Sequence, residues 1–474
     1  MPPLAFPFFL LLISLSASSS EAGSIGINYG RVANDLPTPA KVVELLKTQG
    51  LNRVKLYDTE ATVLSAFANS GIKVVVAMPN ELLSNAAADK SFTDAWVQAN
   101  ISKYYPATQI EAIAVGNEVL KPSLWATVFV DPNNTTKFLV PAMKNVHASL
   151  AKQNLHTAIK VSSPLALSAL QSSFPASSGS FKAELVEPVI KPLLEFLRQT
   201  GSYLMLNAYP FFAYAANADK ISLDYALFKE NAGVVDSGNG LKYSNLLDAQ
   251  IDAVFAAMSA LQYDDVGVAV SETGWPSVGD SNEVGASPEN AASYNGNLVK
   301  RVLSGSGTPL KPNASLDVFL FALFNENQKT GPTSERNYGL FYPSEKKVYD
   351  IPLTAEEVNA SSSTPSAVQK SQVPVSGGEA STTSSSGQTW CVASGGYSEE
   401  KLKDALDYAC GEGGADCTPI QPGATCYNPN TLEAHASYAF NSYYQKKARA
   451  SGTCNFGGAA YVVTQPPSKF LSKV

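Results

Sequence analysis

Short apolar runs recur through the first part of the chain, and stretches with helical periodicity lie between several of them. Eight of the runs are rich in β-branched or aromatic residues and do not alternate with polar ones, as expected of parallel strands covered on both faces. They span residues 25–29, 54–57, 74–78, 112–115, 159–162, 204–208, 266–270 and 318–323. The amphipathic stretches include residues 39–48, 62–69, 243–261 and 287–303.

An alternation of eight strands with helices predicts the α/β class and a (β/α)8 TIM barrel. The alternative is an open, doubly wound parallel sheet, which would place a glycine-rich phosphate loop after its first strand. Only one glycine, Gly30, stands in residues 28–32. The barrel is therefore the favoured architecture.

The cysteines indicate a second, smaller module after the barrel. All five come after residue 390, and the preceding chain has none. A small module in an oxidising compartment commonly needs disulfides, whereas the first part is long enough to rely on its hydrophobic core. We expect a barrel at 23–355, a flexible Ser/Thr-rich linker at 356–389, a mainly helical module at 390–466 and a tail at 467–474.

The first 22 residues are typical of a secretory signal peptide. Their apolar run, residues 4–13, is shorter than the roughly 18 to 20 residues of a membrane span, and small residues precede a cleavage site near Ala22. We expect a protein secreted to the extracellular space or cell wall, without a membrane span and, from its final residues, without a lipid anchor. Five Asn-X-Ser/Thr sites agree with export and are glycosylation candidates: Asn100, Asn133, Asn134, Asn313 and Asn359.

Composition and charge narrow the choice of ligand. Hydrophobic residues make up 45% of the chain and charged residues 16%, which excludes a disordered chain and a coiled coil. The formal net charge is -7, so a basic surface for nucleic acid is not expected. Many aromatic residues with little charge suit a neutral ligand such as a sugar chain.

Two predicted strands end in a glutamate. The fourth runs into Glu118 and the seventh into Glu272. In a barrel the chemistry lies at the C-terminal ends of the strands, and a buried carboxylate must be paired, hydrogen-bonded or protonated. We therefore predict a catalytic pair, against the alternative of two separate structural ion-pair members. The chain has only three histidines, so few residues are available for a Ser-His-Asp triad or as zinc ligands. We therefore expect no metal and no cofactor.

Two carboxylates without a metal meet the requirement of glycoside hydrolysis, in which one protonates the leaving oxygen and the other is nucleophile or base. The segment 266–279, VGVAVSETGWPSVG, resembles the signature of plant glycoside hydrolase family 17, the endo-β-1,3-glucanases. Further matching motifs lie at residues 25–31, 115–118, 207–212 and 324–329. The resemblance implies a retaining (β/α)8 enzyme with Glu118 as acid/base and Glu272 as nucleophile.

Further site residues surround this pair. Asn117, beside the acid, is expected to donate to the substrate 2-hydroxyl. Three charged residues resemble those of the family's cleft: Glu326, Lys329 and Glu335. We expect Lys329 to favour the ionised form of Glu272 and to help hold sugar hydroxyls. The alternative for all three is an ion network that only orders their loop.

Aromatic rings follow several strand ends, where they are placed to stack on sugars. The candidates for substrate binding are Tyr29, Tyr57, Tyr209, Phe212 and Trp275. A general acid also needs a raised pKa, so we expect Glu118 to occupy a less solvated position than its partner.

The last part of the chain resembles carbohydrate-binding module family 43. The matching motifs lie at residues 390–393, 408–411, 415–417, 429–431, 435–444 and 454–458. The implied ligand is again β-1,3-glucan. The resemblance implies the disulfides Cys391–Cys454 and Cys410–Cys417 and leaves Cys426 outside both, whereas spacing alone leaves the pairing open. For His435 we expect a structural role.

Three functions compete at this point. The leading one is endo-hydrolysis of (1→3)-β-D-glucosidic linkages in callose-like glucans and laminarin by a monomer. The second is a catalytically weak glucan-binding wall protein, which the presence of both glutamates disfavours. The third is a transglycosylase, which uses the same residues because a sugar can replace water as acceptor.

Overall fold

The computed structural model describes residues 23–120, 135–363, 389–393 and 399–463, the last range with short gaps at 412, 423, 425, 428–429, 448, 450–452 and 457–458. The chain divides into two compact units, residues 1–368 and 369–474. The predicted signal peptide, tail and most of the predicted linker, and the candidates Asn133 and Asn134, lie outside the described residues.

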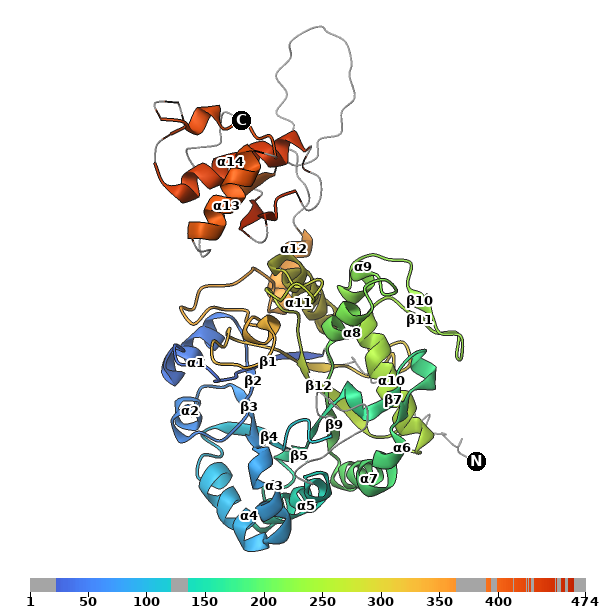
Figure 1. The fold of residues 1–474 in the computed structure, drawn as a ribbon. Helices are drawn as coiled ribbons and strands as arrows, with labels where there is room; N and C mark the ends of the chain where they lie inside the picture. Colours follow the sequence, from blue (N-terminus) through green and yellow to red (C-terminus); the bar gives the residue numbers. More distant parts are fainter. Residues whose placement is uncertain are drawn as a thin grey trace, which may run out of the picture. The chain divides into compact units, whose positions relative to one another are not determined.

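Parallel strands form the centre of the first unit (Figure 1). They are β1 (Ser24–Asn28), β2 (Arg53–Lys55), β3 (Lys73–Met78), β4 (Gln109–Val115), β5 (Lys160–Ser162), β6 (Pro164–Ala166), β9 (Tyr203–Asn207), β12 (Gly267–Thr273) and β13 (Asp317–Leu320). Their order is β5-β4-β3-β2-β1-β13-β12-β9-β6. Only Ser163 separates β5 from β6 in the chain, so these two end strands act as one and close the ring. The predicted TIM barrel is confirmed.

The strands are apolar on both faces, which explains why their sequences do not alternate. Val74 and Val76 of β3 pack toward the helices, while Val75 and Ala77 join a separate cluster inside the ring. That inner cluster is completed by Ala112, Ala114, Met205 and Phe319. The ring is therefore filled by side chains and is a core, not a channel.

Helices surround the ring (Figure 1). The main ones are α1 (Pro39–Thr48), α2 (Ala61–Ala66), α3 (Leu83–Ala88), α4 (Lys90–Val97), α5 (Thr136–Lys152), α7 (Lys191–Thr200), α8 (Pro210–Ala216), α10 (Leu246–Ala260) and α11 (Pro288–Leu303). Polar side chains cap four of them: Glu60 accepts from the Thr62 N–H, Asp89 from the Ser91 N–H, Asn245 from the Asp248 N–H and Ser287 from the Asn290 N–H. The four predicted amphipathic stretches coincide with α1, α2, α10 and α11 to within a few residues.

Some elements were not predicted. Two short antiparallel hairpins, β7 (Leu170–Ser172) with β8 (Ser180–Phe181) and β10 (Val234–Val235) with β11 (Lys242–Tyr243), are too brief to show a periodicity. Helix α12 (Ala355–Ser363) covers the start of the predicted linker. Thr354 caps it by accepting from the Glu357 N–H at 3.3 Å, so the flexible segment cannot begin at residue 356.

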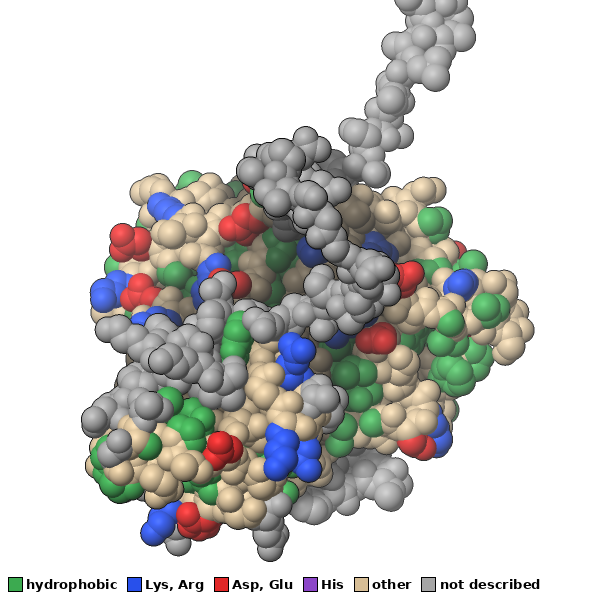
Figure 2. Space-filling view, turned by 90° about the horizontal axis from the view of Figure 1, so that it is seen from above, with side chains coloured by type: hydrophobic (Ala, Val, Ile, Leu, Met, Phe, Trp, Pro, Cys, Tyr) green, Lys and Arg blue, Asp and Glu red, His purple; other side chains and the backbone are tan. Residues whose placement is uncertain are grey.

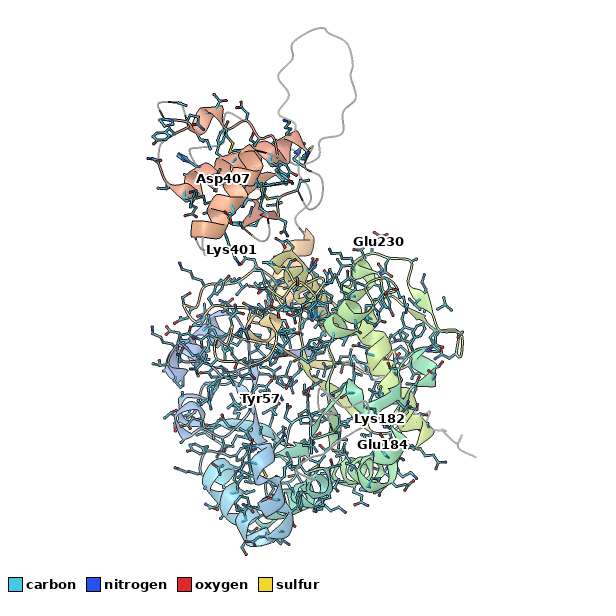
Figure 3. All side chains as sticks on the ribbon, viewed as in Figure 1. Tyr57, Lys182, Glu184, Glu230, Lys401 and Asp407 are labelled. Atoms are coloured by element: carbon cyan, nitrogen blue, oxygen red, sulfur yellow. A yellow bond between two sulfur atoms is a disulfide. The ribbon has the colours of Figure 1, made fainter. Side chains whose placement is uncertain are left out.

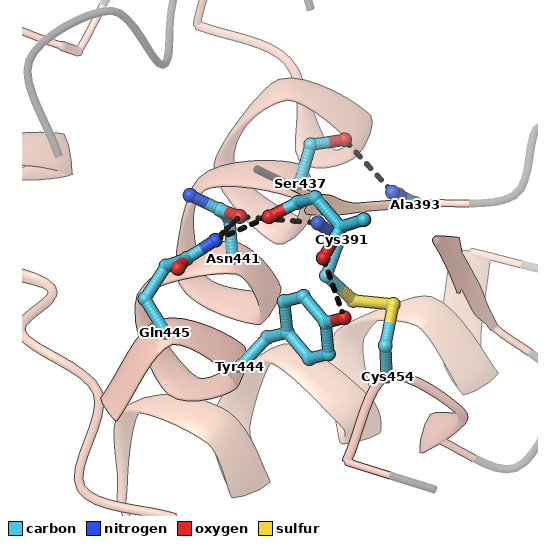
Figure 4. The surroundings of a disulfide bond; sticks show 8 residues. Cys391, Ala393, Ser437, Asn441, Tyr444, Gln445 and Cys454 are labelled. Atoms are coloured by element: carbon cyan, nitrogen blue, oxygen red, sulfur yellow. Dashed lines mark hydrogen bonds between the residues drawn. A yellow bond between two sulfur atoms is a disulfide. The ribbon is translucent and has the colours of Figure 1, made fainter. Parts of the chain in front are cut away.

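The second unit holds two helices, α13 (Glu399–Cys410) and α14 (Leu432–Lys446), and an antiparallel pair of strands, β14 (Trp390–Ala393) and β15 (Ala460–Val463). Both implied disulfides are present, Cys391–Cys454 and Cys410–Cys417, and Cys426 takes part in neither. Figure 4 shows how α14 holds β14 beside the first disulfide: Asn441 accepts from the Cys391 N–H and Ser437 from the Ala393 N–H, both at 3.0 Å.

His435 of α14 contacts the Tyr427 carbonyl through its Nε2, at 2.8 Å, and packs against the Tyr427 ring. It therefore has the structural role that was expected.

The surface carries charges of both signs, and Figure 2 shows Lys and Arg side chains intermixed with Asp and Glu on the face in view. No helix in the described part of the chain is both long and apolar enough to cross a membrane. Among the glycosylation candidates, Asn313 and Asn359 are exposed. Asn100 is half-buried, and its amide donates to the Trp96 carbonyl at 2.9 Å.

Candidate active site

A cleft of about 820 Å³ lies at the C-terminal ends of the barrel strands. Its lining comes from the C-terminal ends of seven strands or the segments after them, those of β1, β2, β4, β6, β9, β12 and β13, together with Ser173 after β7 and Gln250 of α10. Tyr57, which comes shortly after β2, lies toward the middle of the barrel in Figure 3. The predicted site residues that line the cleft are Tyr57, Asn117, Glu118, Tyr209, Phe212, Glu272, Glu326, Lys329 and Glu335.

Glu272 is the most tightly held carboxylate in this cleft. Its side chain is 7% exposed, with Oε1 at 2.9 Å from the Lys55 ammonium and Oε2 accepting from the Tyr209 hydroxyl at 2.9 Å. Burial alone would raise the pKa of Glu272. The Lys55 charge and the hydrogen bonds from Lys55 and Tyr209 outweigh burial and hold that pKa below its usual value, so the group is ionised at neutral pH.

Asn28, which is fully buried at the end of β1, helps to position the Lys55 ammonium that pairs with Glu272. Its Oδ1 lies 3.3 Å from the Lys55 Nζ and accepts from the Tyr57 hydroxyl at 3.0 Å. Its amide nitrogen contacts carbonyl oxygens of the neighbouring strands, those of Ser271, Phe319 and Leu320. The Lys55 ammonium also lies over the Tyr57 ring, 4.0 Å from its centroid. The ring of strands itself therefore positions the charge.

The structure corrects the role expected of Lys329. The residue that favours ionised Glu272 is Lys55, whereas Lys329 Nζ lies 3.5 Å from Glu326 and 3.8 Å from Glu335. These two carboxylates hold Lys329 because they lie close to it on the same loop. Glu326 is 2% exposed and also accepts from the Val32 N–H at 2.8 Å. All three charged residues line the cleft and form an ion network with one another.

Glu118 stands in a tight turn after β4. Gly116 and Glu118 have φ values of 68° and 51°, and at Gly116 a Cβ would lie 2.7 Å from the Val119 side chain. Asn80 braces the turn, because its Oδ1 accepts from the Asn117 N–H at 2.8 Å and its amide donates to the Asn117 carbonyl at 3.1 Å. This geometry directs the acidic side chain into the cleft.

An amide links the two glutamates indirectly. Asn207, at the end of β9, donates to Glu118 Oε1 at 3.0 Å, and its own Oδ1 accepts from the Ser271 hydroxyl at 2.7 Å. Ser271 directly precedes Glu272 in β12. The side chain of Glu118 is half-buried. The expectation that Glu118 would be the less solvated of the two was wrong, because the carboxylate with a cation beside it is the one that can be buried.

Two of the predicted sugar-stacking rings belong to the core. Trp275 is fully buried, donates from its indole to the Gly285 carbonyl at 2.8 Å, and packs against Phe211. Tyr29 is 2% exposed and packs edge-on against Phe324. Neither lines the cleft, so the predicted stacking role is wrong for both: their rings fill space behind the cleft wall.

Several site residues were missed by the sequence analysis. Lys55 carried the clearest signal, as a single cation inside an otherwise apolar strand, and Asn207 stands in a motif already noted. Asn28 and Ser271 also lie in motifs already noted, at residues 25–31 and 266–279, but nothing in the sequence shows which groups these neutral side chains contact. The other missed residues line the cleft walls: Arg31, Asp58, Ser168, Ser173 and Gln250.

The cleft has two chemically different ends. The charged arm lies over the ends of β1, β2 and β13 and is formed by Arg31, Asp58, Glu326, Lys329 and Glu335. The neutral arm lies over the ends of β6 and β9 and is formed by Ala166, Leu167, Ser168, Ser173, Phe212, Ala213 and Gln250. In the order of the closed ring, β1 stands opposite the β5–β6 position, so the cleft crosses the barrel from one arm to the other.

Comparisons with known proteins show which families this chain is similar to. A model of glycosyl hydrolases family 17 matches residues 25–353, and a model of the X8 domain matches residues 389–461. Glucan endo-1,3-beta-glucosidase 12 of Arabidopsis thaliana is 42% identical over 97% of this chain and 86% of its own length. The glucan endo-1,3-beta-D-glucosidase of Olea europaea is 39% identical over 98% and 96%.

Solved structures match the barrel. The β-1,3-glucanase and allergen CJP38 of Cryptomeria japonica pollen is 41% identical, with a TM-score of 0.65 over 70% of this chain and 99% of that chain. One of two plant beta-glucan endohydrolases with distinct substrate specificities is 39% identical, with a TM-score of 0.62 over 69% and 99%. The match to this chain therefore spans almost the whole of both solved chains.

Proposed function

Because the chain belongs to glycosyl hydrolases family 17, we propose that it hydrolyses (1→3)-β-D-glucosidic linkages within glucan chains, with retention of the anomeric configuration. It is a glycoside hydrolase of the glucan endo-1,3-β-glucosidase type. The observation that supports the mechanism best is the buried, ionised Glu272, held by Lys55 and Tyr209 in a cleft that Glu118 also lines.

The two glutamates take different roles in this proposal. Glu272 attacks the anomeric carbon while the glycosidic bond breaks, and Glu118 gives its proton to the leaving oxygen. This forms a covalent glycosyl ester on Glu272. Glu118 then removes a proton from water, whose oxygen attacks the same carbon and releases the Glu272 carboxylate. Lys55 and Tyr209 keep the nucleophile charged and oriented in the resting enzyme.

A cleft that crosses the barrel suits a polymer that extends beyond the cut bond in both directions. Callose and laminarin are the substrates we propose. The test is incubation with laminarin and with a mixed β-1,3/1,4-glucan, with products resolved by mass over time. Endo-hydrolysis predicts short oligosaccharides early in the reaction, whereas products longer than an oligosaccharide substrate would indicate transfer. An absence of products from every glucan would contradict the proposal.

We propose that the X8 unit binds the same polymer. Its surface carries exposed rings, with Tyr408 48% and Tyr461 49% exposed, which suits contact with the flat faces of sugars. Removing residues 369–474 should weaken retention on insoluble β-1,3-glucan and leave rates on short soluble oligosaccharides nearly unchanged, because the cleft belongs to the barrel alone. Equal retention of the full chain and the shortened one would contradict this role.

Secretion is part of the same proposal. A leader-like start, Asn-X-Ser/Thr sites and two disulfides support action outside the cell, where glucan walls lie. Detection of the protein in the culture medium, with its first residue near position 23, is the expected result. Retention in the cytosol with residues 1–22 still attached would contradict it.

A further inference from the structure

Strand β12 has one extra residue at the point where it places Glu272 in the cleft. Val270 and Glu272 pair with consecutive residues of β9, although Ser271 lies between them. The pairing with β13 shows the same extra residue, between Val270 and Thr273. This is a β-bulge, in which two residues oppose one on the partner strand and a side chain is re-aimed. Ser271 and Glu272 therefore both face the inside of the ring, where Ser271 contacts Asn207 and Glu272 lines the cleft.

The backbone beyond the bulge is held from two neighbouring strands. The carbonyl of Glu272 accepts from the Ala208 N–H at 2.9 Å, and that of Thr273 accepts from the Phe321 N–H at 2.7 Å. Neither bond involves a side chain of β12. Because side chains alternate along a strand, the Thr273 side chain is turned away from the cleft, toward the helices outside the ring.

Tyr294 of α11 meets Thr273 on that outer side. Its hydroxyl lies 2.5 Å from the Thr273 hydroxyl, and either atom can be the donor. Both residues are fully buried. The Tyr294 ring also packs against Trp275 and Phe228, with ring centroids 5.5 and 5.4 Å apart. One side chain thus contacts two of the three residues that follow Glu272 in the chain.

The Tyr294 hydroxyl is more than a space filler. A phenylalanine would fill the same space between Trp275 and Phe228, whereas a buried phenol costs free energy unless its hydroxyl is hydrogen-bonded. The bond to Thr273 offsets this cost only when α11 and the end of β12 bring the two hydroxyls together. Satisfied buried polar pairs favour one packing arrangement over its near neighbours. Here the favoured arrangement is the one that places Glu272 beside Lys55.

We propose that Tyr294 is a positioning residue for Glu272. Its bond to Thr273 holds the end of β12 against α11, which keeps the carboxylate beyond the bulge in contact with its ammonium and phenol partners. This rests on the proposed function, because Glu272 must be the nucleophile. Tyr294 is buried behind the strand and is not among the residues that line the cleft. Its influence therefore falls on the reactivity of Glu272 and not on the affinity for glucan.

The test replaces Tyr294 by phenylalanine in the full-length enzyme, which keeps the ring and removes only the hydroxyl. The substrate is a dinitrophenyl β-laminaribioside, whose leaving group needs no proton, so kcat/KM reports attack by Glu272. We expect kcat/KM to fall about three- to ten-fold. The acid limb of its pH profile should move upward by up to about one unit, because a carboxylate less well paired with Lys55 is harder to ionise. Affinity for laminaribiose, measured by calorimetry, should change by less than about two-fold.

Two further variants separate positioning from a general loss of stability. Tyr349→Phe removes another phenol hydroxyl, which accepts from the Asn295 amide of α11 at 2.8 Å, and should leave the rate and the acid limb unchanged. Tyr294→Phe combined with Thr273→Val leaves no unpaired hydroxyl, so thermal stability should recover while the rate stays low. This double variant also takes the place of Tyr294→Phe if the single variant does not fold.

Several results would overturn the assignment. They are a wild-type rate and acid limb in Tyr294→Phe, an equal effect of Tyr349→Phe, and a rate that recovers together with stability in the double variant. Failure of both Tyr294 variants to fold would assign the residue to the stability of the barrel instead. A wild-type enzyme that cleaves neither this substrate nor any β-glucan would refute the proposed function itself.

Discussion

The end of β4 and the end of β12 each present a glutamate to one cleft, yet their surroundings differ in kind. Glu272 is buried, with an ammonium on one oxygen and a phenol on the other. Glu118 is half-buried in a left-handed turn and accepts from a neutral amide. The surroundings of Glu272 hold its pKa below the usual value and so favour its ionised form. Glu118 keeps contact with solvent, as a group that must give and take protons requires.

Replacing each glutamate in turn should have the largest effect on activity and should distinguish the nucleophile from the acid/base. We expect Glu272→Gly to lose activity on every substrate by on the order of 10³-fold or more, because no covalent intermediate forms. Glu118→Ala should lose about 10²- to 10⁴-fold on glucans, and far less on aryl glycosides whose leaving groups need no proton. Initial rates on laminarin and on a dinitrophenyl β-laminaribioside measure both effects.

Azide then tests the assignment by stereochemistry. In Glu118→Ala it should attack the glycosyl-enzyme and give a β-glycosyl azide, whereas in Glu272→Gly it should attack from the vacated face and give the α form. The opposite pair of anomers, identified by NMR, would exchange the roles of the two residues.

Removing the Lys55 ammonium is expected to have the next largest effect, on the pH dependence of kcat/KM. In Lys55→Met the pKa of Glu272 should rise, because burial remains while the favourable charge is lost. The acid limb of the kcat/KM profile should therefore move upward by about one to three pH units. Lys41→Met, which removes an exposed lysine, is the control. An unmoved acid limb in Lys55→Met would show that Lys55 does not set the ionisation of Glu272.

The same change affects stability, with a defined sign. Because the folded-state pKa of Glu272 is lowered, its ionised form stabilises the protein above the pKa of the unfolded chain, and this is lost as pH falls through the folded-state pKa. Lys55→Met should remove that contribution. Thermal unfolding of wild type and variant should therefore differ more at neutral pH than in strong acid.

The smallest expected effect concerns Asn207, whose amide links the two glutamates indirectly. Ser271→Ala removes the hydroxyl that orients Asn207, so the Asn207 contact with Glu118 should loosen. We expect kcat/KM to fall about three- to ten-fold for aryl glycosides with poor leaving groups and hardly at all for good ones. A uniform loss across a leaving-group series would show that Ser271 acts on Glu272 instead.

The barrel was predictable because most of its strands are short apolar runs, and the two glutamates were predictable because two of these runs lead into a carboxylate. The fifth strand was predicted too short, since Ser163 and Pro164 interrupt the pattern, although pairing of β6 with β9 overrides that interruption. Helix α12 was missed because Ser-rich composition hid the cap at Thr354.

The sequence was a poorer guide to which groups the site residues contact. A ring just past a strand end can face the cleft or the core, and only packing places Trp275 inside and Phe212 outside. Lys55 and Lys329 are both cations near strand ends, and the sequence does not show which carboxylate each one meets. Pairing across the ring depends on side-chain direction at each strand end, which residue spacing along the chain does not encode.

The ion pair between Lys55 and Glu272 joins residues 217 positions apart in the chain. A ribosome therefore completes β2 long before it synthesises β12, and the nucleophile has no counter-ion until the late strands have joined the early ones. Catalytic competence is thus a property of the finished ring, so a nascent chain carries no glucanase activity until β13 has joined β1. Turnover itself becomes a reporter of the closed barrel.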